Sequence, residues 1–383
     1  MKYFLIAGEA SGDLHGSNLI KEIKKKDPNA TIYCYGGDLM QKEGGILLKH
    51  YKKMAYMGFL SVLLHLPQIL KNVIDCLCEL SHRTPDCLIL IDYSGFNLRI
   101  AKYAKKKFHL PVFYYIAPKV WAWNEGRIKS LREYVDKILC ILPFEEEYFN
   151  QRGCRATYVG NPVVDAVEQY KTENTPNLHD FIKEHEFNEN GSIVAILCGS
   201  RKTEIKANLP MMLKATEHLN YYKRIIAIAP GIEKEFYSSF VQDRNVYLLK
   251  GETYRLLQHS AIAIVTSGTA TLETALFNVP QVCCYAVKGG KLVYKFYEWM
   301  LKVKYISLVN LILDKPAIKE LISCLFTTES LKREVNRLLF KPAYTDEMKA
   351  NYTLLKEKLG EKGASERVAQ GIVEMLFSIK GGK

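Results

Sequence analysis

Residues 261–285 constrain the fold more than any other stretch, because they have the pattern of a strand, a turn, a helix and a second strand. Residues 261–265 are apolar, partly β-branched and uncharged, which suits a strand buried on both faces of a parallel sheet. The segment Thr-Ser-Gly-Thr at 266–269 offers a glycine and hydroxyls for a helix start, and residues 270–277 favour a helix. The unpaired N–H groups of such a helix start bind anions, and a diphosphate is a common occupant.

Glu273 lies one helical turn after Thr269, on the same face of the expected helix. Its carboxylate could accept hydrogen bonds from both hydroxyls of a ribose while the helix start holds phosphate. A solvated glutamate behind an ordinary helix cap explains the same residues equally well. This stretch alone therefore leaves both a nucleotide site and an ordinary helix open.

The length of 383 residues favours two domains, and 48% apolar with 25% charged residues is ordinary for a soluble, folded protein. The net charge of +12 is compatible with nucleic acid, an anionic membrane surface or a phosphorylated substrate as partner. The basic residues are dispersed, however, and no recognised nucleic-acid-binding motif occurs. Nucleic acid is therefore not an expected partner.

The ten cysteines include no Cys-x-x-Cys pair, so zinc-ribbon spacing is absent and the reduced thiols of a cytosolic protein are the default. The apolar run at 3–7 is too short for the core of a signal peptide and is followed at once by Glu9 and Asp13. We therefore expect a cytoplasmic protein with no metal and no cofactor.

A strand followed by a glycine-containing turn opens the chain. Residues 3–7 are apolar, residues 8–13 read Gly-Glu-Ala-Ser-Gly-Asp, and residues 14–25 favour a helix. The two glycines are four residues apart, so neither the dinucleotide fingerprint Gly-x-Gly-x-x-Gly nor a P-loop is present. Further strand patterns occur at 32–35, 87–91, 111–116 and 138–142, and then at 193–197, 224–229 and 246–249. This alternation predicts an α/β protein with two doubly wound parallel sheets.

Asp92 stands at the carboxyl end of the expected strand 87–91, where open parallel sheets place their ligands. A lone aspartate at a strand end is more often a helix cap, so position alone makes catalysis the minority interpretation. Trp121 and Trp123 crowd the loop that follows the strand at 111–116. Their indoles could cover a ligand or fill a domain edge.

The first domain is predicted to span residues 1–165 and the second 166–364. Residues 158–162 have the composition of a hinge, and a polar, strand-poor stretch separates them from the first strand of the second sheet. Arg201 follows that strand and could bind a diphosphate through two N–H groups. After residue 315 the sequence favours helix to the end of the chain.

Two stretches have the composition of a membrane-facing surface. Residues 54–70 carry no formal charge, but they are interrupted by Gly58 and Pro67 and are short for a transmembrane helix of about 20 residues, so a buried or interfacial helix is expected. Residues 288–305 place lysines on one helical stripe and apolar residues beside it. A core helix explains the first stretch more often, and a helix between domains explains the second equally well. The candidate membrane or acyl-chain contacts are Met57, Phe59, Leu63, Lys291, Lys295, Trp299 and Lys302.

Five motifs stand in a fixed order along the chain. They are residues 8–13, Trp-Ala-Trp at 121–123, Gly-Ser-Arg at 199–201 with Glu204, Ser-Gly-Thr-Ala-Thr-Leu-Glu at 267–273, and Ser-Leu-Val-Asn-Leu at 307–311. In this order they resemble the motifs of lipid-A-disaccharide synthases, and the resemblance covers nearly the whole chain. Each motif alone is weak, but five in register are hard to produce by chance.

The resemblance implies a B-type glycosyltransferase, in which two Rossmann-like domains face a cleft. It implies an acceptor-binding N-terminal domain, a C-terminal domain that binds the UDP-sugar donor, and a last helix at 365–383 that packs back on the first domain. The implied reaction is inverting transfer from UDP-2,3-diacylglucosamine to 2,3-diacylglucosamine 1-phosphate, giving the β-1,6-linked lipid A disaccharide 1-phosphate and UDP. This step belongs to lipopolysaccharide synthesis in Gram-negative bacteria, and it implies an enzyme peripheral to the inner membrane.

The resemblance also assigns roles to individual residues. Asp92 would be the base that takes the proton of the acceptor hydroxyl. The donor-binding residues would be Gly199, Ser200, Arg201, Ser267, Gly268, Thr269, Glu273 and Asn310, and the acceptor or cleft residues Gly8, Glu9, Ser11, Gly12, Asp13, Trp121 and Trp123. No Asp-x-Asp motif occurs, so arginine and the helix dipole are expected to stabilise the leaving UDP in place of a metal ion. The expected partners are the two acylated sugars and an anionic membrane surface, and a homodimer is left open.

The chain departs from the family pattern at three positions. Gly95 stands where the family commonly has a second aspartate, Cys198 where it has a proline before Gly-Ser-Arg, and Asn161 where a histidine often precedes the hinge proline. Asp92 would therefore act without a neighbouring carboxylate. Two other functions stay open: transfer of N-acetylglucosamine to the lipid-linked peptidoglycan precursor, and UDP-sugar epimerisation.

Overall fold

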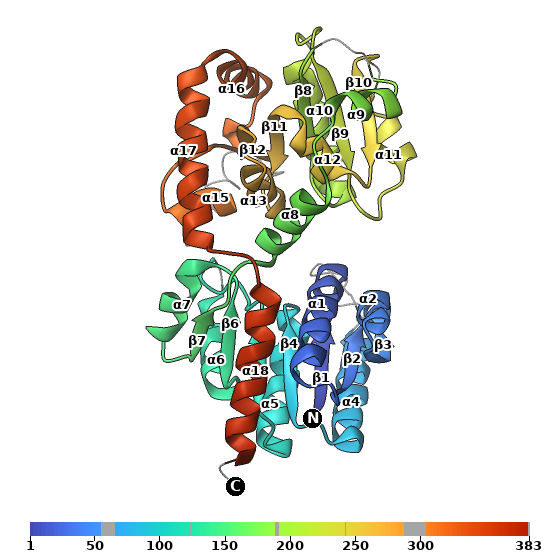
Figure 1. Ribbon diagram of the computed structural model, residues 1–383, viewed down its shortest axis with the longest axis vertical. Coiled ribbons are helices and arrows are strands. Elements are labelled where there is room, and N and C mark those ends of the chain that lie inside the picture. Colours follow the sequence, from blue (N-terminus) through green and yellow to red (C-terminus); the bar gives the residue numbers. More distant parts are fainter. Residues whose placement is uncertain (55–65, 123, 188–190, 242, 287–303, 382–383) are drawn as a thin grey trace. The chain divides into compact units, whose positions relative to one another are not determined.

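The structure is a computed structural model that describes residues 1–54, 66–122, 124–187, 191–241, 243–286 and 304–381. The chain forms two compact units (Figure 1). Unit 1 consists of Met1–Pro162 and Lys362–Lys383, and unit 2 consists of Val163–Glu361. The boundaries predicted from the sequence, 165/166 and 364/365, lie three residues further along the chain in each case.

Unit 1 is built on a seven-stranded sheet in the order β3-β2-β1-β4-β5-β6-β7, and every neighbouring pair is parallel. Its strands are β1 (Lys2–Ala7), β2 (Thr31–Gly36), β3 (Ile46–His50), β4 (Cys87–Ile91), β5 (Val112–Tyr115), β6 (Lys137–Cys140) and β7 (Ala156–Tyr158). Its helices are α1 (Ala10–Lys26), α2 (Asp38–Lys42), α4 (Leu66–Arg83), α5 (Ser94–Phe108), α6 (Ile128–Tyr134), α7 (Pro143–Asn150) and α18 (Ala364–Gly381), with 3₁₀ turns η1 (Tyr51–Lys53) and η2 (Glu125–Arg127).

Both faces of this sheet are buried under helices. Tyr3, Leu5 and Ala7 of β1 enter a core shared with α1 and α18, whereas Phe4 and Ile6 enter a second core shared with α4, α5 and α6. A parallel strand covered on both faces needs apolar side chains at successive positions. This requirement explains the unbroken apolar runs seen in the sequence.

The last helix, α18, completes the core of unit 1 from the opposite end of the chain, and it lies alongside α1 (Figure 1). Val368, Ile372 and Leu376 are buried in the core that holds the odd-numbered side chains of β1. Arg367 adds a polar tie, because its Nε donates to the carbonyl of Val159 at 2.8 Å. Residues more than 200 positions apart in sequence therefore build one side of unit 1.

Unit 2 repeats the design with a six-stranded, all-parallel sheet in the order β10-β9-β8-β11-β12-β13. Its strands are β8 (Ile193–Leu197), β9 (Lys223–Ile228), β10 (Val246–Lys250), β11 (Ser260–Thr266), β12 (Gln281–Tyr285) and β13 (Lys319–Ile322). Its helices are α8 (Pro162–Glu173), α9 (Leu178–Glu184), α10 (Lys202–Thr216), α11 (Lys234–Ser238), α12 (Thr253–Gln258), α13 (Thr269–Leu276), α15 (Leu308–Leu313), α16 (Thr328–Phe340) and α17 (Pro342–Leu359), with the 3₁₀ turn η3 (Ser323–Leu325).

The two doubly wound parallel sheets confirm the predicted fold class, and one local prediction is wrong. The chain after residue 315 is not all helical, because β13 pairs with β12 at the edge of the second sheet. Its sequence, Lys-Glu-Leu-Ile, mixes charge with apolar residues and so lacks the signature of a buried strand. The strands β3 and β7 also lie where the sequence predicts none.

Several expectations from the sequence lie outside the described residues. They concern Met57, Phe59, Leu63, Trp123, Lys291, Lys295, Trp299 and Lys302. In the part of the chain that the structure describes, no helix is both long enough and apolar enough to cross a bilayer.

Candidate active site

The carboxyl ends of β8, β11 and β12 bring three loops of unit 2 together, and the buried Asn208 of α10 ties them to one another. Its Nδ2 donates to Thr266 Oγ1 at 3.0 Å and to the carbonyl of Cys198 at 3.4 Å. Its Oδ1 accepts from the N–H of Ala286 at 3.0 Å. One amide thus holds the loop after β8 beside the start of α13.

Glu204 holds the loop at 199–201 from within the first turn of α10. Its carboxylate accepts from the Ser200 N–H and from Arg201 Nη1, both at 3.0 Å. Gly199 has a φ of +114°, and a Cβ there would lie 2.8 Å from Glu204 Cβ, so a larger residue would be strained and crowded. The Arg201 side chain is 63% exposed, which leaves guanidinium N–H donors facing solvent for an anion.

The start of α13 is open to a ligand. Within the described residues no side chain caps its first turn, and no atom lies within 4 Å of where a Cβ of its N-cap, Gly268, would stand. Thr269 is exposed. Ser267 is committed to the fold, because its Oγ donates to the carbonyl of Ile306 at 2.8 Å and its N–H to the carbonyl of Cys284 at 3.2 Å. Backbone N–H groups and the positive end of the helix dipole can therefore bind an anion here.

Glu320 of β13 organises the neighbouring segment at the start of α15. Its Oε1 accepts from the Ser307 N–H at 2.9 Å, Ser307 Oγ at 2.7 Å and Asn310 Nδ2 at 2.9 Å. Its Oε2 accepts from the Ile306 N–H at 3.1 Å. Because Ser267 bonds to Ile306, this carboxylate indirectly supports the start of α13.

Asn310 was predicted to contact the donor, but its side chain is used inside the protein. It is buried, its Oδ1 accepts from the Ile318 N–H at 2.9 Å, and its Nδ2 donates to the Ile318 carbonyl at 2.9 Å as well as to Glu320. We therefore treat Asn310 as a residue that positions the loop and not as a ligand contact.

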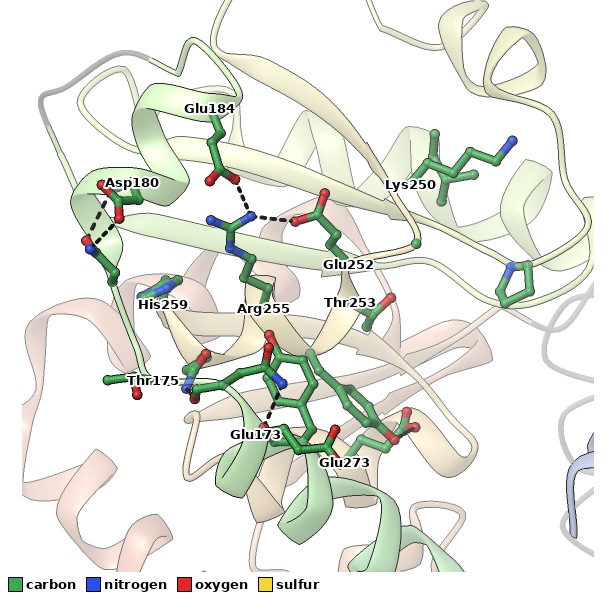
Figure 2. A pocket seen from close by; sticks show the side chains of 18 of the residues that line it. Glu173, Thr175, Asp180, Glu184, Lys250, Glu252, Thr253, Arg255, His259 and Glu273 are labelled. Carbon is green, nitrogen blue, oxygen red and sulfur yellow. Dashed lines mark hydrogen bonds and ion pairs between the residues drawn. The ribbon is translucent and has the colours of Figure 1, made fainter. Parts of the chain in front are cut away.

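A cavity of about 930 Å³ opens in unit 2 where β9 and β10 end, next to α8, α9, α12 and α13 (Figure 2). Glu273 of α13 lines it, and the Tyr254 hydroxyl donates to Glu273 Oε1 at 2.9 Å. Burial raises the pKa of Glu273, and the bond from Tyr254 partly opposes that rise. The cavity is within the size range of sites for small ligands.

Among the charged side chains that line this cavity, one group is formed by an arginine and two glutamates. Arg255 pairs with Glu252 at 3.0 Å and with Glu184, and Figure 2 shows these three on one side with Glu273 on the other. In that group one guanidinium pairs with two carboxylates, so the group keeps a net negative charge. Glu273 thus lines the cavity from a position one turn into α13.

In unit 1 the chain turns sharply at the carboxyl end of β4. Asp92 and Tyr93 have φ values of +46° and +45°, a left-handed conformation that is unfavourable for residues other than glycine. The Asp92 carbonyl accepts from the Tyr114 hydroxyl at 2.6 Å and from the buried Asn97 Nδ2 at 2.8 Å. The Tyr93 hydroxyl donates to the carbonyl of Met54 at 2.6 Å. These bonds hold the strained turn and leave Asp92 exposed.

The loss of nearby water and the surrounding charges together set the protonation of Asp92. Desolvation by the surrounding protein raises the pKa of the Asp92 carboxyl. The charge of Lys119 and a hydrogen bond from the Tyr93 N–H lower this pKa by a smaller amount. Gly95 is exposed, and none of the described residues has an atom within 4 Å of where a Cβ at this position would stand. Within that part of the chain no side chain takes the place of the second aspartate of the family pattern, and Asp92 is the carboxylate at this turn.

Among the predicted acceptor residues at the start of unit 1, Gly8, Gly12 and Asp13 make close contacts inside the protein. A Cβ on Gly8 would lie 2.2 Å from the ring of Tyr93, and one on Gly12 would lie 3.1 Å from Cβ of Ala7. The carboxylate of Asp13 is buried and accepts from three N–H groups at the start of α2, at 2.8 to 3.1 Å. Asp13 is thus a helix cap and is not available to an acceptor. Glu9 is half-buried and Ser11 is exposed at the start of α1.

Trp121 is buried, which favours the second of the two interpretations left open by the sequence, an indole that fills an edge of the domain. Its Nε1 donates to Glu145 Oε1 at 3.0 Å, and its ring meets Phe144 edge-on at 5.1 Å between centroids. Burial raises the pKa of Glu145 to about 7, and the bonds from Trp121 and from the Leu142 N–H oppose the rise. The indole therefore serves the core of unit 1.

Comparison with known proteins decides which family this chain belongs to. The model of the lipid-A-disaccharide synthetase family matches residues 3–372. The lipid-A-disaccharide synthase of Myxococcus xanthus is 34% identical over 98% of this chain and 97% of its own length, and that of Syntrophus aciditrophicus is 35% identical over 95% of each. The chain belongs to the lipid-A-disaccharide synthetase family. The resemblance found in the sequence motifs is confirmed.

Solved structures similar to this member of the lipid-A-disaccharide synthetase family establish the fold at low sequence identity. A Staphylococcus aureus structure titled "S. aureus MnaA-UDP co-structure" is 12% identical with a TM-score of 0.69, covering 98% of this chain and 96% of the other. The Methanocaldococcus jannaschii UDP-GlcNAc 2-epimerase in complex with UDP-GlcNAc and UDP is 14% identical with a TM-score of 0.66, covering 98% and 100%. At this identity the likeness concerns the fold alone.

Sequence motifs missed the residues that support the candidate site. Asn208, Glu320 and Tyr114 hold the loops through bonds to residues more than ten positions away, which no motif implies. Asn97 acts over a shorter range, through a bond to Asp92. Tyr254, the partner of Glu273, gave no signal in the sequence either. Only Asn97 carried a weak signal, since it ends the segment 92–97 that the family pattern contains.

Replacing Glu320 by alanine should lower the free energy of unfolding by about 2–3 kcal/mol, because four donors lose a charged acceptor. The measurement is the midpoint of urea unfolding. Glu347→Ala, at an exposed glutamate of α17, is the matched control and should change stability by less than about 0.5 kcal/mol. Equal stability of both variants would show that the Glu320 network is not formed.

Glu273→Ala should weaken UDP binding about tenfold or more. The variant removes a half-buried carboxylate that is expected to accept hydrogen bonds from the ribose hydroxyls of UDP. Isothermal calorimetry with UDP measures the effect. Glu217→Ala, at an exposed position after α10, should bind UDP as the wild type does. Unchanged UDP affinity in Glu273→Ala would place the nucleotide elsewhere.

Proposed function

We propose that unit 2 binds UDP-2,3-diacylglucosamine across the start of α13. The diphosphate would lie on the N–H groups from 268 onward and on Arg201, with the ribose hydroxyls on Glu273 and the uracil in the cavity where β9 and β10 end. The observation that carries this proposal is the position of Glu273. It stands one turn beyond an uncapped helix start and faces a cavity large enough for a nucleoside.

As a member of this family the chain is a UDP-sugar-dependent glycosyltransferase of lipid A disaccharide synthesis. In the proposed reaction, the 6-hydroxyl oxygen of 2,3-diacylglucosamine 1-phosphate attacks the anomeric carbon of the donor from the face opposite UDP. A new C–O bond forms, the bond to the diphosphate breaks, and its electron pair leaves with UDP. The configuration inverts, which gives the β-1,6 link.

Asp92 is the proposed base that takes the proton of the 6-hydroxyl. The turn holds its backbone through Tyr114 and Asn97, while the residue stays exposed and able to meet a substrate. A carboxylate within hydrogen-bond reach is a sufficient base for an alcohol whose attack is already under way. The raised pKa of Asp92 makes it a somewhat stronger base than an ordinary aspartate.

Charge on the departing UDP would be stabilised by the dipole of α13 and by Arg201. Both are fixed before the substrate arrives, since Glu204 holds the Arg201 loop and Glu320 supports the segment next to α13. Donors that are fixed in advance stabilise developing charge without a cost of reorganisation at the moment of reaction.

The sequence left two other functions open. The solved structures with the same fold include UDP-GlcNAc 2-epimerases, but at 12–14% identity they are evidence for the fold and not for the reaction. The family model, in contrast, matches nearly the whole chain. An assay with UDP-N-acetylglucosamine as competing donor separates the acylated donor from the donor of the peptidoglycan pathway and of the epimerases.

Asp92→Asn should keep UDP affinity and lose about 10²–10⁴-fold in turnover of the two acylated sugars, as expected when a general base is lost. The wild-type rate should fall toward low pH with an apparent pKa above the ordinary 3.8, because the base works deprotonated and its pKa is raised. The measurement is initial rate against pH. Asp346→Asn, an exposed change on α17, serves as the control. Near-normal turnover in Asp92→Asn would refute the assignment.

Peripheral attachment to an anionic membrane is part of the same proposal, since both substrates carry acyl chains. The described surface that supports it is the exposed face of α4, which continues from the uncharged run at 54–70. Leu70 and Ile74 are 49% and 61% exposed one helical turn apart, with the exposed Lys71 beside them. Apolar side chains flanked by lysine are typical of a helix at a membrane surface.

The double variant Leu70→Ser/Ile74→Ser should reduce sedimentation with anionic liposomes at high salt, because buried apolar side chains, unlike lysines, are not screened. Its thermal stability should stay close to that of the wild type, since both side chains face solvent. Tyr103→Ser, at a 45% exposed position on α5, is the control. Wild-type protein that stays in the supernatant at low salt would contradict membrane attachment.

A further inference from the structure

Two cationic side chains flank the Asp92 turn in unit 1. Lys119 is exposed in the loop that follows β5, and its charge acts on the Asp92 carboxylate. Arg127 of η2 donates through Nη1 to Ser94 Oγ at 2.6 Å, in the first turn of α5. The charge of Arg127 also acts on Tyr114, whose hydroxyl holds the Asp92 carbonyl. Both cations therefore belong to the surroundings of the base.

The chain places Lys119 there by a short route. β5 ends at Tyr115, directly beside Ile91 of β4, and the Tyr115 carbonyl accepts from the Asp92 N–H at 3.2 Å. Four residues later, the carbonyl of Lys119 accepts from the Ala122 N–H at 3.1 Å, which fixes a turn at this point. The loop thus starts beside the base, and the Lys119 charge that acts on the Asp92 carboxylate stands four residues along it.

A cation beside a general base works against catalysis unless it also binds another group. It favours the ionised carboxylate and so lowers the basicity on which proton removal depends. Glu145, the other carboxylate on which Lys119 acts, is buried and has both oxygens bonded, to Trp121 and to the Leu142 N–H. Lys119 itself is exposed to solvent and has three N–H donors, so its ammonium is able to bind an anionic ligand.

The acceptor of the proposed reaction supplies such an anion. In a pyranose, the anomeric carbon and the carbon that carries the 6-hydroxyl arm are both next to the ring oxygen. An anomeric phosphate and the 6-hydroxyl therefore lie along one edge of the sugar, a side-chain length apart. A substrate whose 6-hydroxyl meets Asp92 brings its phosphate into the region of Lys119 and Arg127. Without cations there, phosphate and carboxylate would repel each other.

We propose that Lys119 and Arg127 bind the anomeric phosphate of the acceptor while Asp92 takes the proton of the 6-hydroxyl. This inference rests on the proposed function and adds to it a phosphate-recognition site within unit 1. Two cations that hold one phosphate fix the direction of the sugar, so they select the 6-hydroxyl over the hydroxyl on the opposite edge of the ring. Guanidinium and ammonium groups are both common ligands of phosphate.

The test compares two acceptors with each protein: 2,3-diacylglucosamine 1-phosphate and the same acylated sugar without phosphate. Lys119→Met keeps the length of the side chain and removes the charge. Its kcat/KM with the phosphorylated acceptor should fall about ten- to a hundredfold, the range of a charge-assisted bond. Lys119→Met also removes a charge that acts on Asp92, and that change affects both acceptors alike, so the loss specific to the phosphate is read from the ratio of the two kcat/KM values. Arg127→Gln should show the same phosphate-dependent loss.

Lys129→Met is the matched control, because Lys129 is an exposed lysine at the start of α6, two residues after Arg127. It should keep wild-type rates with both acceptors, and all variants should bind UDP equally. Equal losses of Lys119→Met with both acceptors, or no loss with either, would overturn the phosphate site. A wild-type protein that transfers to neither acceptor would instead overturn the proposed function itself.

Discussion

Every strand of both sheets is parallel, and a parallel strand in a doubly wound fold must bury both of its faces. This constraint forces helices onto each face of the sheet and leaves polar loops at its ends. In unit 2 the loops that follow β8, β11 and β12 are joined by Asn208, and in unit 1 the turn that follows β4 is held by Asn97 and Tyr114. Both candidate sites therefore depend on buried amides or hydroxyls that satisfy backbone groups where strands end.

The same constraint explains which strands could be predicted. The sequence predicts Cys87–Ile91, Ile193–Leu197 and Gln281–Tyr285 with their observed bounds, because each is covered on both sides by neighbouring strands and on both faces by helices. The strands that it misses, β3, β7 and β13, are all at the edges of their sheets. An edge strand has less of its surface covered, so it tolerates polar residues and loses the apolar run on which recognition depends.

Motifs located the candidate site but did not separate ligand contacts from structural ones. Asp13, Trp121 and Asn310 stand in motifs that resemble those of the family, yet each is already bonded inside the protein. The partners of these side chains lie eight or more residues away, and no local sequence pattern indicates a partner at such a distance. The left-handed conformation of Asp92 is equally invisible in sequence, because neither Asp92 nor Tyr93 is a glycine. A motif thus marks where a particular geometry is needed, whereas only contacts show what each residue does.

The packing of α18 on the first sheet has a consequence for synthesis of the protein. Unit 2 is one continuous stretch, Val163–Glu361, so its strands leave the ribosome before α18 does. Unit 1 has to wait, because the core beside β1 is closed by Val368, Ile372 and Leu376. The N-terminal sheet is thus translated first but completed last, with one apolar face open while the second unit emerges. The unit that begins the chain is therefore the last one whose core has all of its side chains available.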